Sequence, residues 1–242
     1  MRGDVGSPGA AVGRAQTVGE RDLAVRPAPT DQTHDRERFH SYVPIEGHGL
    51  AFDPLKAIVA PRPIGWISSV DADGKANLAP YSYFNLFCNK PPLLGFSSQG
   101  VKDSQRNILA TGEFVYNLPT AALARSVNLS AIDARPGHSE FEITALEQIP
   151  SDLVRPPRVA ESPAAFECRL TQVVTLAGVD KVATNWTLIL GEVVRVHINR
   201  DYIVDGKFDT AQARPLARCG YADAYSVTEE LLFIDPPQWP GR

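Results

Sequence analysis

Hydroxyl groups, a glycine and a lysine gather in the stretch "SSQGVKDS" at residues 97–104, which contains Ser97, Ser98, Lys102 and Ser104. A helix is expected to begin directly after Lys102, and the free N–H groups and positive dipole at a helix start favour an anion. Serine hydroxyls and a lysine ammonium add hydrogen-bond donors. The stretch predicts a phosphate site, although a capped helix with a solvated lysine would explain the same residues. It matches neither a Walker loop nor a dinucleotide fingerprint.

A second mixed stretch, "NLAPYSYFN" at 77–85, combines polar side chains with three aromatic rings. Pro80 removes a ladder donor and is expected to turn the chain out of a sheet, which would leave backbone groups facing a ligand. Asn77, Ser82 and Asn85 offer donors and acceptors, while the tyrosines offer flat apolar surface. A flat heteroaromatic ring with polar edges needs both kinds of contact. A core-lining turn with satisfied asparagines is the alternative.

Arg62 stands between two prolines in "PRPIGWISS" at 61–69, so its backbone is stiff and its position defined. An arginine held in this way can bind a phosphate or a carboxylate. An exposed arginine at a strand start is an equally good interpretation.

Residue patterns for metal or acid–base chemistry are not found. The five histidines show no metal-ligand spacing, so no metal is predicted. No nucleophile elbow and no placed pair of carboxylates occurs, and no catalytic side chain is predicted. His197 lies in an expected strand and is interpreted as structural. His138, in a glycine-containing loop, is the better candidate for a functional histidine.

The elements expected to position these residues are mostly strands. A hairpin is predicted over 63–80 around the turn "DADGK". Helices are expected at 102–112, capped by Asp103 or Ser104 and ended by Gly112, and at 120–130, capped by Thr120. Further strands are expected at 91–98, 113–118, 164–176 and 186–198, the last with a bulge at Gly191. Many strands and few short helices favour an antiparallel barrel with helices at its edges.

Composition narrows the class of protein. The 242 residues allow a sizeable core, and the net charge of −4 without a basic stripe argues against a nucleic-acid partner. No apolar run approaches about 18 residues, so no membrane partner is expected. Residues 1–38 are rich in small and charged residues and are predicted to be a disordered tail, with one domain over 39–242.

The start of the chain has no apolar segment of the kind found in secretory signals, and the three cysteines are odd in number and widely spaced. Cys88, Cys168 and Cys219 are therefore interpreted as reduced thiols in a cytoplasmic protein.

Together, "PRPIGW", "NLAPYSYFN", "FSS" and "KDSQRN" resemble the flavin reductase-like family of FMN-binding split-barrel proteins. The resemblance is unbroken from about 48 to 118, continues more loosely to "RPLARCGYADAY", and covers about four-fifths of the chain. It implies a mainly β fold, a six-stranded antiparallel split barrel, and a homodimer with FMN near the subunit interface.

The resemblance also implies the cofactor-binding residues. These are Arg62, Ser68, Ser69, Asn77, Ala79, Pro80, Tyr81, Ser82, Asn85, Ser97, Ser98, Lys102, Asp103 and Ser104. Asp103 would repel a phosphate through its carboxylate, so it is expected to act through its backbone N–H or as a helix cap. Ser69 stands where many relatives have threonine. Cys219 and Tyr221 depart from the family pattern, so the resemblance does not define the substrate-side wall.

The implied activity is an FMN-dependent NAD(P)H oxidoreductase, which passes hydride from the nicotinamide to FMN and electrons on to a second acceptor. That acceptor is free flavin for a monooxygenase, a nitroaromatic or other small oxidised substrate, or a protein. Asn185 and Trp186 are candidates for the open face of the flavin. The alternatives are a flavoredoxin-like electron carrier and a non-catalytic FMN-binding protein.

Overall fold

The computed structural model describes residues 38–132 and 139–238. The described residues divide into two units, residues 38–49 with 232–238, and Leu50–Leu231. The described part of the first unit holds the short 3-10 helix η2 (Pro44–Glu46). The tail predicted over 1–38, apart from its last residue, and His138 lie outside the described residues.

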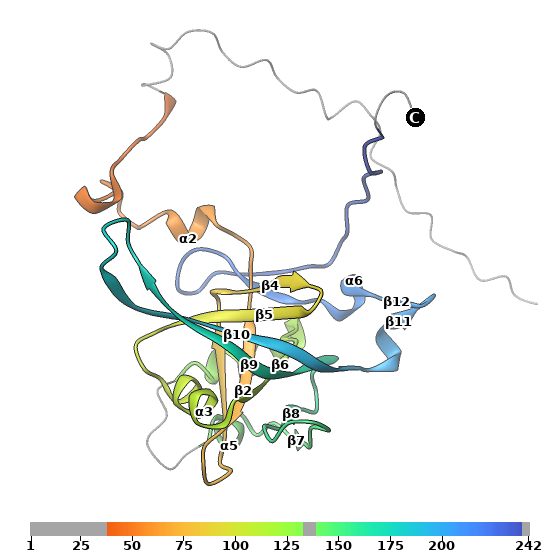
Figure 1. Cartoon of the computed structure of the whole chain (residues 1–242). Coiled ribbons are helices and arrows are strands. Elements are labelled where there is room, and N and C mark those ends of the chain that lie inside the picture. Colours follow the sequence, from red (N-terminus) through yellow and green to blue (C-terminus); the bar gives the residue numbers. More distant parts are fainter. Residues whose placement is uncertain (1–37, 133–138, 239–242) are drawn as a thin grey trace, which may run out of the picture. The chain divides into compact units, whose positions relative to one another are not determined.

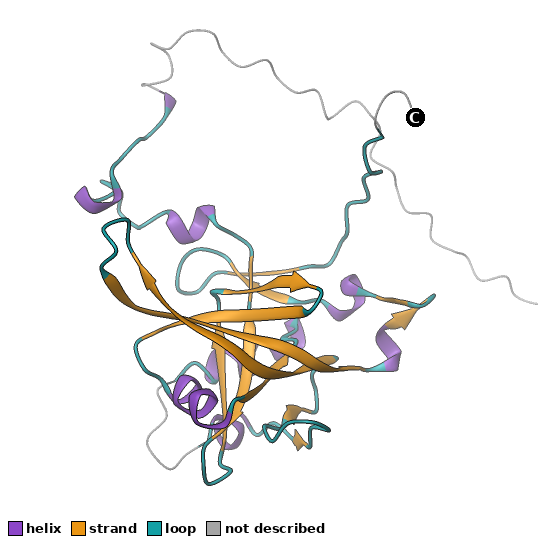
Figure 2. Ribbon diagram, in the orientation of Figure 1, coloured by secondary structure: helices purple, strands orange, loops and turns teal. Residues whose placement is uncertain are grey.

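One antiparallel sheet organises the second unit, which is mainly β with few helices (Figures 1 and 2). Its strand order is β3-β2-β6-β9-β10-β5-β4. The bounds are β2 (Gly65–Val70), β3 (Ala76–Tyr81), β4 (Phe84–Asn89), β5 (Pro92–Gln99), β6 (Glu113–Asn117), β9 (Ala164–Ala177) and β10 (Ala183–Ile198).

The sheet has seven strands, where six were expected, and no pairing among the described residues closes it into a barrel. The additional strand is β4, which follows "NLAPYS" and pairs with β5 from Phe84↔Phe96 to Asn89↔Pro92. Its side chains are mostly exposed, so the sequence lacks the alternation that marks a half-buried strand.

The predicted hairpin at 63–80 is confirmed by the β2–β3 pairing. Asp71 Oδ1 accepts from the N–H groups of Asp73 (3.0 Å) and Lys75 (2.8 Å), which fixes the turn. Pro80 does not turn the chain out of the sheet, because it pairs with Trp66 within β3. This strand is outermost in the sheet order, and an edge strand tolerates the missing donor.

The two long strands predicted at 164–176 and 186–198 are confirmed as β9 and β10, which pair with each other as an antiparallel hairpin. Their register shifts between Leu190 and Gly191, as expected for a bulge. A Cβ atom on Gly191 would lie 2.4 Å from the Phe114 ring, so glycine is required there by close packing.

Helix α3 (Asp103–Thr111) ends at Gly112, whose φ of +73° provides the predicted left-handed cap. The cap predicted at Asp103 or Ser104 is wrong, because the N-cap residue of α3 is Lys102. Thr120 is an N-cap residue as predicted, although its side chain makes no cap bond. The second predicted helix is split into η3 (Ala121–Leu123) and α4 (Ala124–Leu129).

The remaining elements are short. The helices are α2 (Leu55–Ile58), α5 (Glu140–Thr144), η4 (Arg200–Tyr202) and α6 (Thr210–Ala213). A three-stranded sheet contains β1 (Arg62–Pro63), β13 (Leu216–Arg218) and β14 (Tyr225–Val227). Two further pairs are β7 (Gln148–Ile149) with β8 (Arg158–Val159), and β11 (Ile203–Val204) with β12 (Lys207–Phe208). No helix among the described residues is long and apolar enough to cross a bilayer.

Strand β2 is buried on both faces and separates two apolar cores. Ile67 belongs to a cluster with Phe96 and Phe114, while its neighbour Trp66 belongs to a cluster with Phe141. Successive strand residues point to opposite faces, so each core takes alternate residues of β2. Its neighbour β3 is thereby held in place, and β3 forms one wall of the cavity described next. The three cysteines are free thiols, as predicted.

Candidate functional site

A cavity of about 440 Å³ is walled by β3, β5, the start of α3 and the segments around residues 130–132 and 140. Its volume lies in the range of small-molecule sites, roughly 300–1,000 Å³. Ten of the fourteen predicted site residues line it: Asn77, Ala79, Pro80, Tyr81, Ser82, Ser97, Ser98, Lys102, Asp103 and Ser104. The fold therefore brings the phosphate-like loop and the "NLAPYS" stretch together around one space. Their contacts with a ligand stay a prediction.

Ser68 and Ser69 do not line this cavity, and both are fully buried in β2. The Ser68 hydroxyl donates to the Pro157 carbonyl at 2.5 Å, and the Ser69 hydroxyl accepts from Asn107 at 3.2 Å. Their hydroxyls hold neighbouring segments onto β2, which is a structural use of the residues expected beside a flavin.

Arg62 and Asn85 also lie outside the cavity lining. The Arg62 guanidinium donates to the carbonyls of Lys56 (2.5 Å) and Val59 (2.7 Å), which occupies one of its nitrogens with backbone of this chain. Asn85 is exposed on β4, and its Oδ1 accepts from the N–H of Leu86. Cys219 and Tyr221, which depart from the family pattern, do not line the cavity either.

The start of α3 lines one end of the cavity. The first N–H groups of a helix have no intrahelical acceptor, and the N-cap residue Lys102 makes no side-chain cap bond to them. Lys102 is exposed at the rim, and the Asp103 carboxylate pairs with the Arg106 guanidinium. This ion pair offsets the negative charge that was expected to repel a phosphate. The geometry suits an anion at this end of the cavity.

Buried polar groups form the inner wall. Asn77 bonds to the Ser104 hydroxyl at 2.9 Å, and the Leu78 N–H donates to a carboxylate oxygen of Glu140 at 3.1 Å. The Tyr81 hydroxyl is buried near the hydroxyls of Ser98 and Ser104, but it makes no hydrogen bond of good geometry with any described residue. Burial raises the pKa of Tyr81, so its hydroxyl keeps its proton and remains a donor at neutral pH.

Aromatic rings close another side. Tyr83 and Trp186 meet edge to face with centroids 4.9 Å apart, and both line the cavity. Trp186 was a candidate for this wall, whereas Asn185 does not line it and its carbonyl accepts from Gly100. The cavity thus combines an end that suits an anion, a polar wall and aromatic surface.

A family model for the flavin reductase like domain matches residues 59–212, well over half of the chain. The chain belongs to the flavin reductase-like family. An uncharacterized protein of Deinococcus radiodurans is 37% identical to it over 200 residues, which cover 76% of this chain and 85% of that protein.

Two solved structures resemble this flavin reductase-like protein. Nitrilotriacetate monooxygenase component B from Bacillus cereus has a TM-score of 0.69 and 27% identity, and the match covers 88% of this chain and 98% of that one. The 2-nitrobenzoate 2-nitroreductase NbaA from Pseudomonas fluorescens has a TM-score of 0.68 and 26% identity, with coverage of 78% and 91%.

Glu140 and Arg106 are among the residues that line the cavity of this flavin reductase-like protein without being predicted as site residues. Glu140 lies in a segment of uncertain type, and its only signal is the capping box formed by Ser139 and Glu142 just around it. Arg106 lies on the helix expected at 102–112, where no role was assigned to it, whereas Tyr83 was expected to offer flat apolar surface. Glu140 and Arg106 reach the cavity because α5 and α3 pack against β3.

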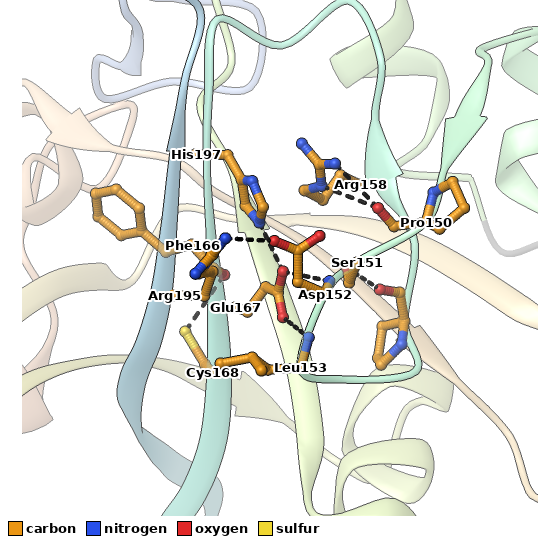
Figure 3. A network of polar contacts seen from close by, with 11 residues as sticks. Pro150, Ser151, Asp152, Leu153, Arg158, Phe166, Glu167, Cys168, Arg195 and His197 are labelled. Carbon is orange, nitrogen blue, oxygen red and sulfur yellow. Dashed lines mark hydrogen bonds and ion pairs between the residues drawn. The ribbon is translucent and has the colours of Figure 1, made fainter.

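His197 belongs to a separate polar cluster around the fully buried Glu167 (Figure 3). Its Nε2 lies 2.6 Å from Glu167 Oε1, which agrees with its interpretation as a satisfied structural histidine. Asp152 is near enough to complete three potential metal ligands, yet its carboxylate is already paired with Arg195 at 2.8 Å. The guanidinium takes the place of a cation, so we interpret the cluster as structural.

Proposed function

We propose that the cavity binds FMN and that the protein is an FMN-dependent NAD(P)H oxidoreductase. The observation that carries this proposal is one cavity lined by the start of α3 with Lys102, by the buried Tyr81, and by the rings of Tyr83 and Trp186. A phosphate, a polyol chain and a flat ring are the three parts of FMN, and they match these three surfaces. Family membership supports the same ligand.

The chain's own residues would bind and orient the cofactor. The N–H groups at the start of α3 and the Lys102 ammonium would hold the phosphate. The inner wall would meet the polyol chain, and Tyr83 and Trp186 would exclude water beside the ring. Bound FMN would supply the hydride-accepting chemistry, which explains why no acid–base pair is needed.

Steady-state oxidation of NADH and NADPH by purified protein, with and without FMN, tests the enzymatic part of the proposal. We expect turnover that depends on FMN and increases with free flavin or a nitroaromatic as acceptor. The names of the two structural relatives, a monooxygenase component and a nitroreductase, support both acceptor classes. Tight FMN binding without oxidation of either nucleotide would instead favour an electron carrier or a non-catalytic flavin-binding protein.

The phosphate contact leads to a specific prediction for Lys102. We expect Lys102→Ala to weaken FMN binding roughly fivefold, because an exposed charge contact is worth up to about 1 kcal/mol. The measurement is quenching of FMN fluorescence on titration with protein. Lys207→Ala, which removes an exposed lysine from the remote strand β12, should leave the affinity unchanged. Equal affinity of the Lys102 variant and wild type would remove Lys102 from the site.

A homodimer is part of the proposal. Strand β4 is outermost in the sheet order and carries Leu86 and Phe87, both more than half exposed. An exposed apolar edge strand is a surface that a second chain can cover. Light scattering should give twice the chain mass, and a monomer that still binds FMN tightly would contradict the dimer while leaving the cofactor proposal intact.

A further inference from the structure

Glu140 places a buried carboxylate in the wall of the cavity, where no role is yet assigned to it. The residue is only 5% exposed. Its Oε2 accepts from the Leu78 N–H at 3.1 Å and, with the Asn77 amide oriented so that both its ends are satisfied, from Asn77 at 3.3 Å. Its second oxygen, Oε1, accepts no hydrogen bond from any described residue. A buried carboxylate normally satisfies both oxygens, so this one has capacity for a donor from a ligand.

The carboxylate is held firmly in place. Glu140 is the first residue of α5, and the preceding Ser139 caps that helix through its capping box. The Ser139 hydroxyl also donates to the Ala76 carbonyl at 2.6 Å, which ties the start of α5 to β3. On the other side, the Thr144 hydroxyl donates to the Glu140 carbonyl at 2.6 Å. Such support from neighbouring groups is what a preorganised binding residue requires.

The direction of the hydrogen bonds decides what the wall can recognise. A carboxylate only accepts, so the Asn77 amide turns its NH₂ toward Glu140 and its oxygen toward the Ser104 hydroxyl, 2.9 Å away. Ser104 then donates to Asn77, and its oxygen can accept from a ligand as well as from the neighbouring Tyr81 hydroxyl. The wall formed by Glu140, Asn77 and Ser104 therefore offers acceptors, while the start of α3 offers donors. A ligand must bring hydroxyl groups to the first and an anion to the second.

We propose that Glu140 is a specificity-determining residue whose Oε1 accepts a hydrogen bond from a hydroxyl group of the ligand's polyol chain. This inference rests on the proposed function, because it assigns the polyol part of a flavin nucleotide to the inner wall. A carboxylate repels a phosphate, so this assignment places the polyol chain, and not the phosphate, beside Glu140.

The test measures the dissociation constants of FMN and lumiflavin for Glu140→Gln and for wild type. Lumiflavin has the same ring system as FMN but neither polyol nor phosphate. The glutamine oxygen can still accept from Leu78, while its NH₂ replaces the Oε1 acceptor. We expect the FMN dissociation constant to rise about tenfold or more, as for loss of a hydrogen bond to a charged group, and that of lumiflavin to change less than about twofold. Glu147→Gln, on an exposed side chain nearby, is the matched control and should change neither.

If Glu140 had a purely structural role, Glu140→Gln would weaken the binding of both ligands by the same factor. That result, or unchanged FMN binding, would overturn the inference. A second measurement needs no variant. Wild-type protein should bind riboflavin, which has the polyol without the phosphate, at least about tenfold more tightly than lumiflavin. Equal affinities would overturn the inference while FMN binding through the phosphate still stood. Wild-type protein that binds no FMN would overturn the proposed function itself.

Discussion

Replacing Glu167 with alanine is expected to lower the free energy of unfolding by about 3–5 kcal/mol. The carboxylate is fully buried in β9 and accepts from the N–H groups of Asp152 (2.7 Å) and Leu153 (2.6 Å) and from His197. Its removal would leave two backbone donors and a histidine without their acceptor. Each unsatisfied buried group costs about 1–3 kcal/mol. Figure 3 shows how these contacts fasten the segment around Asp152 to the sheet.

Urea denaturation measures this loss, with Glu230→Ala, at an exposed carboxylate, as the control that should stay within about 0.5 kcal/mol of wild type. A Glu167→Ala variant as stable as wild type would show that the segment is held by other contacts. The stability of Glu167→Gln should lie between that of Glu167→Ala and that of wild type. Its amide oxygen retains one acceptor, while its NH₂ group faces a donor.

The same cluster predicts a pH dependence of stability. Burial raises the pKa of Glu167, but the N–H groups of Asp152 and Leu153 and the His197 ring outweigh it, so the pKa lies below the usual range. A depressed pKa stabilises the fold above the unfolded value of about 4.3, and this contribution is lost as the pH falls through the folded pKa. Asp152 and Arg195 are the other charged groups facing the cluster. Wild type should therefore lose more stability than Glu167→Gln between neutral and acidic pH, and parallel profiles would contradict this assignment.

Trp66→Ala is expected to cost about 3–5 kcal/mol of stability, the usual range for a fully buried tryptophan. Trp66 has no exposed surface and packs with Leu78 and Phe141 in the second core. Its Nε1 also donates to the Ser130 hydroxyl at 2.9 Å. Ser130 lines the cavity, so this bond connects the core to the proposed site.

Trp66→Phe separates packing from this hydrogen bond. It keeps most of the apolar volume and should cost only about 1–2 kcal/mol, from one lost bond and a smaller ring. Denaturation curves of both variants give the comparison. A phenylalanine variant as unstable as the alanine variant would mean that the bond to Ser130, and not the buried ring, stabilises this region.

Local chemistry was readable from the sequence where it depends on neighbouring residues. The turn at Asp71, the left-handed cap at Gly112 and the bulge at Gly191 follow from residue type at one position. The two polar stretches at 77–85 and 97–104 also stood out, and most of their residues line one cavity. A stretch with too many polar groups for a core and too many aromatic rings for a surface marks such a wall.

Features set by distant partners were not readable in this way. Ser68 and Ser69 are polar residues in a strand, and only the fold shows that Pro157 and Asn107 take up their hydroxyls. Pro80 was expected to break a strand, but its effect depends on whether β3 is an edge strand. Glu140 reaches the cavity through the packing of α5 on β3, which no local pattern indicates.

The most direct test of the account is the visible absorbance of purified protein that has been mixed with FMN, freed of unbound flavin, and then titrated with NADH or NADPH without oxygen. We predict that flavin absorbance stays with the protein and bleaches when one of the nucleotides is added. Protein that is colourless after it has been saturated with FMN and freed of unbound flavin would contradict the claim that this cavity is a flavin site.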